Sequence, residues 1–324
     1  MNESAWHLIG DIGGTNARFG LVREGQNGYQ SVATYQVADH PDFGDVLNHL
    51  MADIKRMGLA NGAPQIACFA VAGPPHLDTI SFTNSPWAFS RDIVCQHTGV
   101  ERAHIINDFA AVARALPALT DADLIQIGGG SPQPSAPKVA LGPGTGLGVA
   151  GLLQHISGDA IVVTGEGGHV DFAPVTDVEA AVLKFLRARF GRVSIERLCC
   201  GDGIVNIYQA LADHRGAKAT FTRAADIGEA AQRGDDPLAR ETMAMFFAVL
   251  GSSAGNFALT FGALGGVYVA GGIAPRYIDL LRRSDFRARF LAKGRFADYL
   301  SVIPTYIITH EGIGLLGAAL SLHD

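Results

Sequence analysis

The segment Gly10-Asp11-Ile12-Gly13-Gly14-Thr15 decides the fold, because it joins two apolar stretches through a short glycine-rich turn. Apolar Leu8-Ile9 precedes it, and the mostly apolar run from Phe19 to Val22 follows it. This pattern predicts a β-hairpin that carries the glycines at its tip. Glycines let backbone N–H groups approach phosphate oxygens, and the Thr15 hydroxyl adds a further donor.

The same design recurs in the second half of the chain. Lys138-Val139-Ala140-Leu141 runs into Gly142-Pro143-Gly144-Thr145-Gly146-Leu147-Gly148, and a mostly apolar stretch follows. Either turn alone is equally consistent with a tight hairpin that binds nothing. Two copies of one phosphate-sized turn predict a duplicated α/β domain with a nucleotide held between the copies.

Strands and helices alternate between the two glycine turns. Apolar positions from Phe43 to Met57 fall at helical spacing and predict an amphipathic helix. The apolar runs at 66–72 and 104–106 predict strands, separated by a helix that Ser90 caps. Alternation of this kind predicts an α/β layer structure.

The second half continues with helices and two more strands. Thr176 with Glu179 predicts a capping box, and Pro237 suits the first turn of a long helix. Strands are predicted at 267–269 and 306–308, and a last helix is expected to pack on the first domain. The aperiodic stretch 128–134 predicts a connection between domains.

Length, composition and charge limit the classes of protein to which this chain can belong. A chain of 324 residues suggests two domains, and a formal net charge of -6 provides no basic surface, so a nucleic-acid partner is not expected. We expect a cytoplasmic protein with no membrane partner, since neither an export signal nor an apolar run of ~20 residues is present. The four cysteines, Cys68, Cys95, Cys199 and Cys200, lack metal-site spacing and predict buried thiols.

Polar residues beside the predicted strand ends are the candidate catalytic and ligand-binding residues. Asp11, next to the first turn, suits Mg²⁺ bound with phosphate, or an Asx hydrogen bond within the turn. Asn107-Asp108 follows a strand, where ligands bind in open α/β sheets, although Asp108 could simply cap the next helix.

Three further residues stand on predicted loops. Glu166 and His169 lie among glycines in Gly165-Glu166-Gly167-Gly168-His169, after another strand. His169 is as consistent with an ordinary loop histidine as with a ligand contact. Glu196 is as readily explained by a surface ion pair with Arg197. Together, however, acids, an amide and an imidazole are the groups that bind a polyhydroxylated ligand.

Two common nucleotide motifs do not account for these features. No Gly-Lys-Ser or Gly-Lys-Thr follows either turn, so neither is a Walker P-loop. The match Gly312-Ile313-Gly314-Leu315-Leu316-Gly317 follows a strand, but no second strand or ribose-binding acid comes after it. We expect those glycines to serve close helix packing.

The motifs together resemble the bacterial glucokinase family, within the superfamily of actin-like ATPases and hexokinases. The resemblance runs nearly end to end. The matching segments are 10–18, Thr83-Asn84-Ser85-Pro86-Trp87, Ile106-Asn107-Asp108-Phe109, 142–148, the most distinctive block 165–174 (GEGGHVDFAP), and Ala270-Gly271-Gly272-Ile273. Cys199-Cys200 is a local departure, since relatives carry less cysteine there, and it leaves the geometry of that turn open.

The resemblance implies ATP and Mg²⁺ as cofactors and transfer of phosphate to the 6-hydroxyl of glucose, the first step of glycolysis. It implies Asp108 as the general base, with Asn107, Glu166, His169 and Glu196 holding the other sugar hydroxyls. Asp11 would organise Mg²⁺. The segments implied to bind ATP are Gly10, Asp11, Ile12, Gly13, Gly14 and Thr15 with Gly144, Thr145 and Gly146 at the phosphates, and Gly271 and Gly272 beside adenosine.

The resemblance also implies an architecture. It is the two-domain α/β actin-like ATPase fold, which is ribonuclease H-like, with the active site in the interdomain cleft. The smaller domain would comprise residues 1–118 plus 309–324, and the larger one residues 119–308. The partners implied are the small molecules glucose and ATP, and a homodimer is left open.

Two other classes of function share parts of this pattern. A sugar-binding regulator could keep the fold without the chemistry, but it would need neither Asp108 nor Asp11. An actin-like filament or chaperone ATPase would not need the loop from Glu166 to His169. ADP release measured with and without glucose separates the three.

Overall fold

The computed structural model describes residues 5–26, 28–73, 75, 77–81, 87–154 and 160–322. Contacts divide the chain into two compact units, Met1–Leu119 with His310–Asp324 and Thr120–Thr309. Each unit has its own β-sheet and its own apolar core.

The first unit is built on a five-stranded mixed sheet. Its strands are β1 (Trp6–Ile12), β2 (Asn16–Arg23), β3 (Gln30–Gln36), β4 (Ile66–Val71) and β7 (Arg102–Asn107), and β5 (Ile80–Ser81) and β6 (Ala88–Phe89) form a separate pair. The order is β3-β2-β1-β4-β7. The β1–β2 and β2–β3 pairs are antiparallel, whereas β4 is parallel to both β1 and β7. The predicted hairpin at the start of the chain is confirmed.

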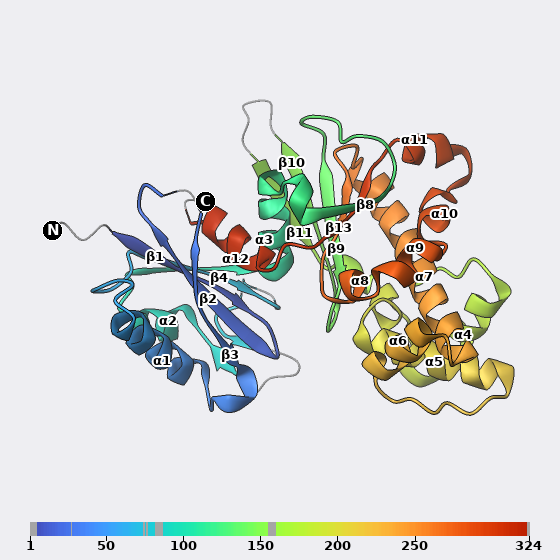
Figure 1. Cartoon of the computed structure of the whole chain (residues 1–324), viewed down its shortest axis with the longest axis horizontal. Helices are drawn as coiled ribbons and strands as arrows, with labels where there is room; N and C mark the ends of the chain where they lie inside the picture. The colour runs from blue at the N-terminus through green and yellow to red at the C-terminus, as the bar shows by residue number, and fades with distance from the viewer. Residues whose placement is uncertain are drawn as a thin grey trace. The chain divides into compact units, whose positions relative to one another are not determined.

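Helices cover both faces of this sheet (Figure 1). They are α1 (Phe43–Arg56), α2 (Arg91–Thr98), α3 (Asp108–Ala115) and α12 (Ile313–Leu320), with 3-10 turns η1 (Val37–Asp39) and η2 (Leu116–Ala118). Because side chains alternate along a strand, Leu8 and Ile12 of β1 join the core under α1 and α2, while Ile9 packs with Leu315 of α12. The last helix therefore packs on the first unit, as predicted.

The second unit has a six-stranded sheet. Its strands are β8 (Leu124–Gly128), β9 (Lys138–Pro143), β10 (Leu147–Gln154), β11 (Ala160–Gly165), β12 (Val267–Val269) and β13 (Thr305–Ile308). The order is β11-β10-β9-β12-β13-β8. The β10–β11 and β9–β10 pairs are antiparallel, and β12 is parallel to β9 and β13. The first five strands in this order repeat the first sheet strand for strand, which confirms the predicted duplication.

Helices gather around the long helix α7 in the second unit (Figure 1). They are α4 (Asp177–Phe190), α5 (Gly201–Arg215), α6 (Ala224–Arg233), α7 (Pro237–Phe261), α8 (Ile273–Arg276), α9 (Ile278–Arg283), α10 (Phe286–Leu291) and α11 (Ala297–Ser301). Pro237 opens α7 after its N-cap Asp236, as predicted. By length and apolar composition α7 could span a membrane, but 61% of that apolar window is buried within the protein. We therefore describe α7 as a core helix.

The predicted connection between domains at 128–134 is wrong. This stretch lies inside the second unit, and the chain passes between units at Leu119–Thr120 and at Thr309–His310. Gly129 has φ +89°, and a Cβ there would lie 2.1 Å from the Ile303 carbonyl oxygen. The glycines that suggested a linker are therefore required by a left-handed backbone and close packing.

The predicted capping box of α4 is only half formed. Thr176 Oγ1 accepts a hydrogen bond from the Glu179 N–H at 3.2 Å. The Glu179 carboxylate instead accepts from the Val175 N–H at 2.7 Å and pairs with Arg289 of α10. Arg289 offers the Glu179 carboxylate a charged hydrogen-bond partner, and such a bond is stronger than a bond to the backbone N–H of the cap residue.

Candidate active site

Three parallel strands of the first unit end at one edge of its sheet. Ile12 of β1 pairs with Val71 of β4, and Val71 pairs with Asn107 of β7. The turn 13–15 follows β1, and Asp108 follows β7. The strand register thus brings the first glycine turn and Asn107-Asp108 to the same edge, where ligands bind in open α/β sheets.

The glycines of the first turn have two different roles. Gly10 lies within β1, and a Cβ there would come 2.8 Å from Cδ1 of Phe69, so this glycine serves core packing. Ile12 is fully buried as well. Gly13 donates its N–H to the Asn16 carbonyl at 2.9 Å, which closes the turn. A Cβ on Gly14 would meet no atom within 4 Å, so this side of the turn is open.

Asp11 lies on β1 beside this turn and faces Arg18 of β2. Its Oδ2 is 3.6 Å from Arg18 Nη1. A Cβ on Gly314 of α12 would come 2.6 Å from Asp11 Cγ, so α12 packs directly on this carboxyl group. Burial raises the pKa of Asp11 above its ordinary value, and the Arg18 guanidinium opposes that shift. A divalent cation would favour the charged form further, and a carboxylate oxygen is a ligand that Mg²⁺ accepts.

Asn107, and not Asp108, is the N-cap of α3. Asn107 Oδ1 accepts from the backbone N–H groups of Phe109 at 2.9 Å and Ala110 at 3.1 Å. Asp108 is the first residue of the helix, and its Oδ1 accepts from Phe109 N–H at 2.8 Å. The interpretation of Asp108 as a helix cap is therefore wrong. The cap uses the amide oxygen of Asn107, and its NH₂ group is the part that can donate to a ligand.

In the second unit, Glu196 contacts the second glycine turn. Its Oε2 accepts from the Leu147 N–H at 2.8 Å. A Cβ on Gly146 would lie 2.6 Å from that same oxygen, so Gly146 is what allows the carboxylate to approach. Arg197, expected as an ion-pair partner, lies over the ring of Phe190, 4.2 Å from its centroid. The carboxylate of Glu196 thus faces the turn.

His169 lies next to Glu196. Its Nε2 is 4.0 Å from Glu196 Oε1. The two residues meet because the segments that flank them pair: Ile195 N–H donates to the Val170 carbonyl at 3.0 Å, and Phe172 N–H to the Val193 carbonyl at 3.0 Å. Glu166 is exposed at the end of β11, and its carbonyl accepts from the His169 N–H at 3.0 Å. The structure therefore brings these three predicted residues together.

Glycines hold this loop and the adjacent turn close to the sheet. A Cβ on Gly168 would lie 2.2 Å from the Leu147 carbonyl oxygen, and one on Gly167 would lie 2.8 Å from Val149 Cβ. Gly271, which has φ +84°, would place a Cβ 2.5 Å from the Pro143 carbonyl oxygen. By contrast, a Cβ on Gly144 or Gly272 would meet no atom within 4 Å. These two glycines border open space beside β9 and β12.

Two contributors to the site were missed in the sequence. Arg192 donates to the His169 carbonyl at 2.6 Å and pairs with Asp171 at 2.7 Å. Cys200 caps α5, since its Sγ accepts from the Gly203 N–H at 3.3 Å. Burial raises the pKa of Cys200 to about 11, so the thiol stays protonated. No local sequence pattern marks either residue, because cysteine is not a usual helix cap and Arg192 stands in an ordinary turn.

The motif at 83–87 is described only in part. Thr83 to Pro86 lie outside the described residues. Trp87 is buried in the core of the first unit, and its Nε1–H donates to the His40 carbonyl at 3.1 Å.

Comparison with known proteins identifies the family. The sequence profile named Glucokinase matches residues 8–324. A glucokinase from Marinobacter nauticus is 43% identical over 322 residues, which cover 99% of this chain and 98% of that protein. The chain belongs to the glucokinase family. The resemblance and the glucokinase function predicted from the motifs are confirmed.

Solved structures agree with the architecture. The crystal structure of a glucokinase from an Antarctic psychrotroph has a TM-score of 0.84 and 36% identity, and the match covers 98% of each chain. A glucokinase from Balamuthia mandrillaris, crystallised in complex with glucose, has a TM-score of 0.81 at 21% identity, covering 99% of this chain and 94% of that one. The chain thus has the mixed α/β fold of sugar kinases.

Proposed function

We propose that the protein transfers the γ-phosphoryl group of MgATP to the 6-hydroxyl of glucose, with Asp108 as the general base. One observation carries the assignment of the base. Asp108 stands at the end of β7, where ligands bind, while the neighbouring Asn107 caps α3. A carboxylate at that position is therefore not needed to cap the helix. It lies at the positive end of the α3 dipole, which stabilises a negative charge.

The base has a defined task in this reaction. A carboxylate within hydrogen-bond reach aligns the primary alcohol and accepts its proton as transfer proceeds. The rest of catalysis is positioning and electrostatic stabilisation, since the protein forms no covalent bond to the phosphoryl group. The NH₂ group of Asn107 would hold a neighbouring sugar hydroxyl.

We further propose that Glu166, His169 and Glu196 bind the remaining sugar hydroxyls. Carboxylates accept hydrogen bonds from hydroxyl donors, and charge-assisted bonds of this type are the stronger ones. The bond from Leu147 N–H fixes one oxygen of Glu196 and leaves Oε1 on the side of His169. The backbone that follows the Gly144–Gly146 turn thereby orients Glu196, a residue that would bind the sugar.

The nucleotide would be held by the two glycine turns. The segment Gly10–Thr15 and the residues Gly144–Gly146 would approach the ATP phosphates, and Gly271-Gly272 would border adenosine. Asp11 would hold Mg²⁺, which supplies charge neutralisation at the phosphates. The open space beside Gly14, Gly144 and Gly272 supports this assignment, because no protein atom occupies the place of a side chain there.

We propose that the two units are the domains of the actin-like ATPase fold, with the sugar and the nucleotide in the cleft between them. The smaller domain would span residues 1–118 with 309–324, and the larger one residues 119–308. Closure around the substrates would exclude water, which otherwise competes as the phosphoryl acceptor. Since ATP is the donor, the reaction belongs in the cytoplasm.

Coupled measurement of ADP release tests the function as a whole. We expect release to depend on glucose and on Mg²⁺, and to fall with hexoses that lack the 6-hydroxyl. ADP release that is independent of any sugar would instead indicate an ATPase. A panel that includes mannose and glucosamine then defines the specificity.

The substitutions Glu166→Gln and His169→Ala are each expected to weaken glucose binding and to leave ATP binding nearly unchanged. Hydrogen bonds to charged groups contribute roughly 1.5 to 3 kcal/mol, which corresponds to about a 10- to 150-fold loss of affinity. Calorimetric titration of each variant with glucose and with ATP checks this. If both ligands are lost equally, these residues maintain the fold instead.

The substitution Gly144→Ala is expected to raise KM for ATP by on the order of tenfold, with the stability unchanged. Its new methyl group would meet no protein atom, so only a ligand in that space would be displaced. The matched variant Gly146→Ala also pushes on the Glu196 carboxylate and should therefore raise KM for glucose as well. Steady-state kinetics with each substrate varied in turn separates the two. An unchanged KM for ATP in Gly144→Ala would place the phosphates elsewhere.

A further inference from the structure

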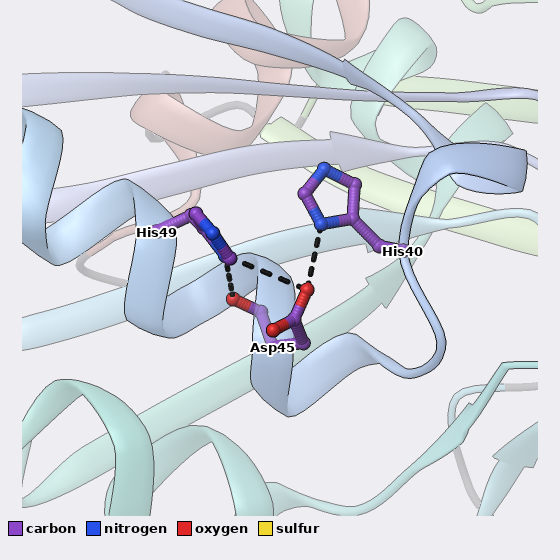
Figure 2. Close-up of side chains that lie close together, drawn as sticks. All are labelled: His40, Asp45 and His49. Carbon is purple, nitrogen blue, oxygen red and sulfur yellow. Dashed lines mark hydrogen bonds and ion pairs between the residues drawn. The ribbon is translucent and has the colours of Figure 1, made fainter.

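A cluster of two histidines and one aspartate lies in the first unit, and none of its members takes part in the proposed reaction. His40 follows η1, and Asp45 and His49 stand on α1 (Figure 2). The His40 ring points toward the Asp45 side chain, whereas the His49 ring contacts both the Asp45 backbone carbonyl, 2.8 Å from Nδ1, and the carboxylate (Figure 2). His40 Nδ1 is 2.8 Å from Asp45 Oδ2, and His49 Nδ1 is 3.4 Å from the same oxygen.

We propose that His40, Asp45 and His49 bind a divalent transition-metal ion of the Zn²⁺ class. Each residue offers one ligand atom, and these atoms all lie within 4.8 Å of one another. Around a tetrahedral Zn²⁺ with bonds of about 2.0 to 2.2 Å, donor atoms stand about 3.4 Å apart. The observed separations therefore require only small side-chain movements. Asp45 and His49 are spaced i,i+4, which places them on one face of the helix.

The surroundings hold two of these ligands in place. His40 is fixed through its backbone, because its carbonyl accepts from Trp87 Nε1–H at 3.1 Å, and its ring packs edge-on against Tyr35 at 5.4 Å. Asp45 stands in the first turn of α1, where its N–H donates to Asp42 Oδ1 at 2.8 Å. A site built on such supported residues loses little entropy when the ion binds.

Exposure and charge also suit an ion that arrives from solution. The side chains of His40, Asp45 and His49 are 13%, 33% and 59% exposed, so solvent reaches the cluster from the His49 side. That side can supply water as the remaining ligand. No lysine or arginine occurs between Glu24 and Ile54, whereas Asp39 and Asp42 stand nearby in sequence. No lysine or arginine close in sequence therefore competes with a metal ion for the Asp45 carboxylate.

The donor set determines the class of metal. Two imidazole nitrogens and one carboxylate oxygen suit Zn²⁺, Co²⁺, Ni²⁺ or Cu²⁺, whereas Mg²⁺ requires oxygen ligands. The proposed site therefore differs in its ligand atoms from the site of the Mg²⁺ ion that accompanies ATP. A bound ion would clamp η1 to α1, at a corner whose Val37 N–H donates to the carbonyl of Thr15 at 2.9 Å.

Calorimetric titration of the full-length protein with ZnCl₂, in excess Mg²⁺ and without nucleotide, tests the proposal. We expect binding of a single ion that Mg²⁺ does not displace, and a rise in the midpoint of thermal unfolding with Zn²⁺ concentration. His49→Gln and His40→Gln should each weaken binding by on the order of 10- to 100-fold or more. The matched control His214→Gln removes an exposed histidine of the second unit and should bind as the wild type does.

Two results would overturn the proposal. One is Zn²⁺ affinity that is unchanged in both His49→Gln and His40→Gln, which would place the ion at other histidines. The other is displacement of Zn²⁺ by Mg²⁺ at similar concentration. Because His49 is largely exposed, His49→Gln should fold, and an unfolding midpoint equal to that of the wild type without metal verifies this. Co²⁺ absorption in the visible range then reports nitrogen ligation in the wild type and its loss in His49→Gln.

Discussion

Replacing Asp108 with asparagine (Asp108→Asn) is expected to lower kcat by on the order of 10² to 10⁴, while much of the glucose binding remains. Asparagine keeps the shape and the hydrogen-bond acceptor for the Phe109 N–H, but it cannot take a proton from the sugar hydroxyl. The cap of α3 is formed by Asn107 and is untouched by this change. The loss should therefore appear in kcat and not in stability. Steady-state kinetics and thermal unfolding of the same preparation measure both.

A matched substitution controls for the helix position. Asp177 is the first residue of α4, after the cap Thr176, just as Asp108 is the first residue of α3 after Asn107. Asp177→Asn therefore makes the same chemical change at the same helix position, and it should retain kcat. If Asp108→Asn keeps more than about a tenth of the wild-type kcat, Asp108 is not the base.

Replacing Glu179 with alanine (Glu179→Ala) is expected to lower the free energy of unfolding of the second unit by about 3 to 5 kcal/mol. The Glu179 carboxylate accepts from Arg289 Nη1 at 2.6 Å and Nη2 at 3.1 Å, which joins α4 to α10. Its side chain is 3% exposed, and that of Arg289 is 14% exposed. Removing the carboxylate leaves a guanidinium charge buried without its partner, which costs more than the bonds themselves.

Urea unfolding followed by circular dichroism measures this loss. The exposed pair between Arg233 and Asp235 is a suitable comparison, with side chains 58% and 55% exposed. Asp235→Ala should cost no more than about 1 kcal/mol. If the two variants lose the same free energy, burial of the Glu179 pair is not what makes it important. Replacing Glu179 and Arg289 together by methionine should recover much of the loss, because no unpaired charge then remains.

Elements that depend on short stretches of chain were predictable. The hairpins around Gly13–Thr15 and Gly144–Gly146 follow from glycine turns between apolar runs, and both occur as predicted. The same holds for α1, where apolar side chains recur at helical spacing, and for α2, which Ser90 caps. In each case the residues that determine the element are its own or its immediate neighbours.

Predictions failed where a partner far along the chain decides the local structure. The glycines at 128–130 suggested a linker, but Gly129 and Gly130 lie against residues 302–304, more than half the chain away. Glu179 was expected to complete the cap of α4, yet Arg289 is its partner. Neither partner can be recognised from spacing, because the contact exists only once the second unit has folded.

The sequence by itself determined the two glycine hairpins, the duplicated α/β design, the glucokinase family and the candidate residues of the site. These follow from local patterns and from motifs that persist along the chain. Only the tertiary structure decided that Asn107 caps α3 and so frees Asp108 from that role. It also decided that Glu196 binds Leu147 N–H and lies beside His169, and that His40 meets Asp45 and His49. For Glu196 and His169 the physical reason is that backbone pairing between segments remote in sequence sets their distance. For Asn107 and for His40 the neighbours are close in sequence, but the backbone that places them is held by packing, as the bond from Trp87 Nε1–H to the His40 carbonyl shows.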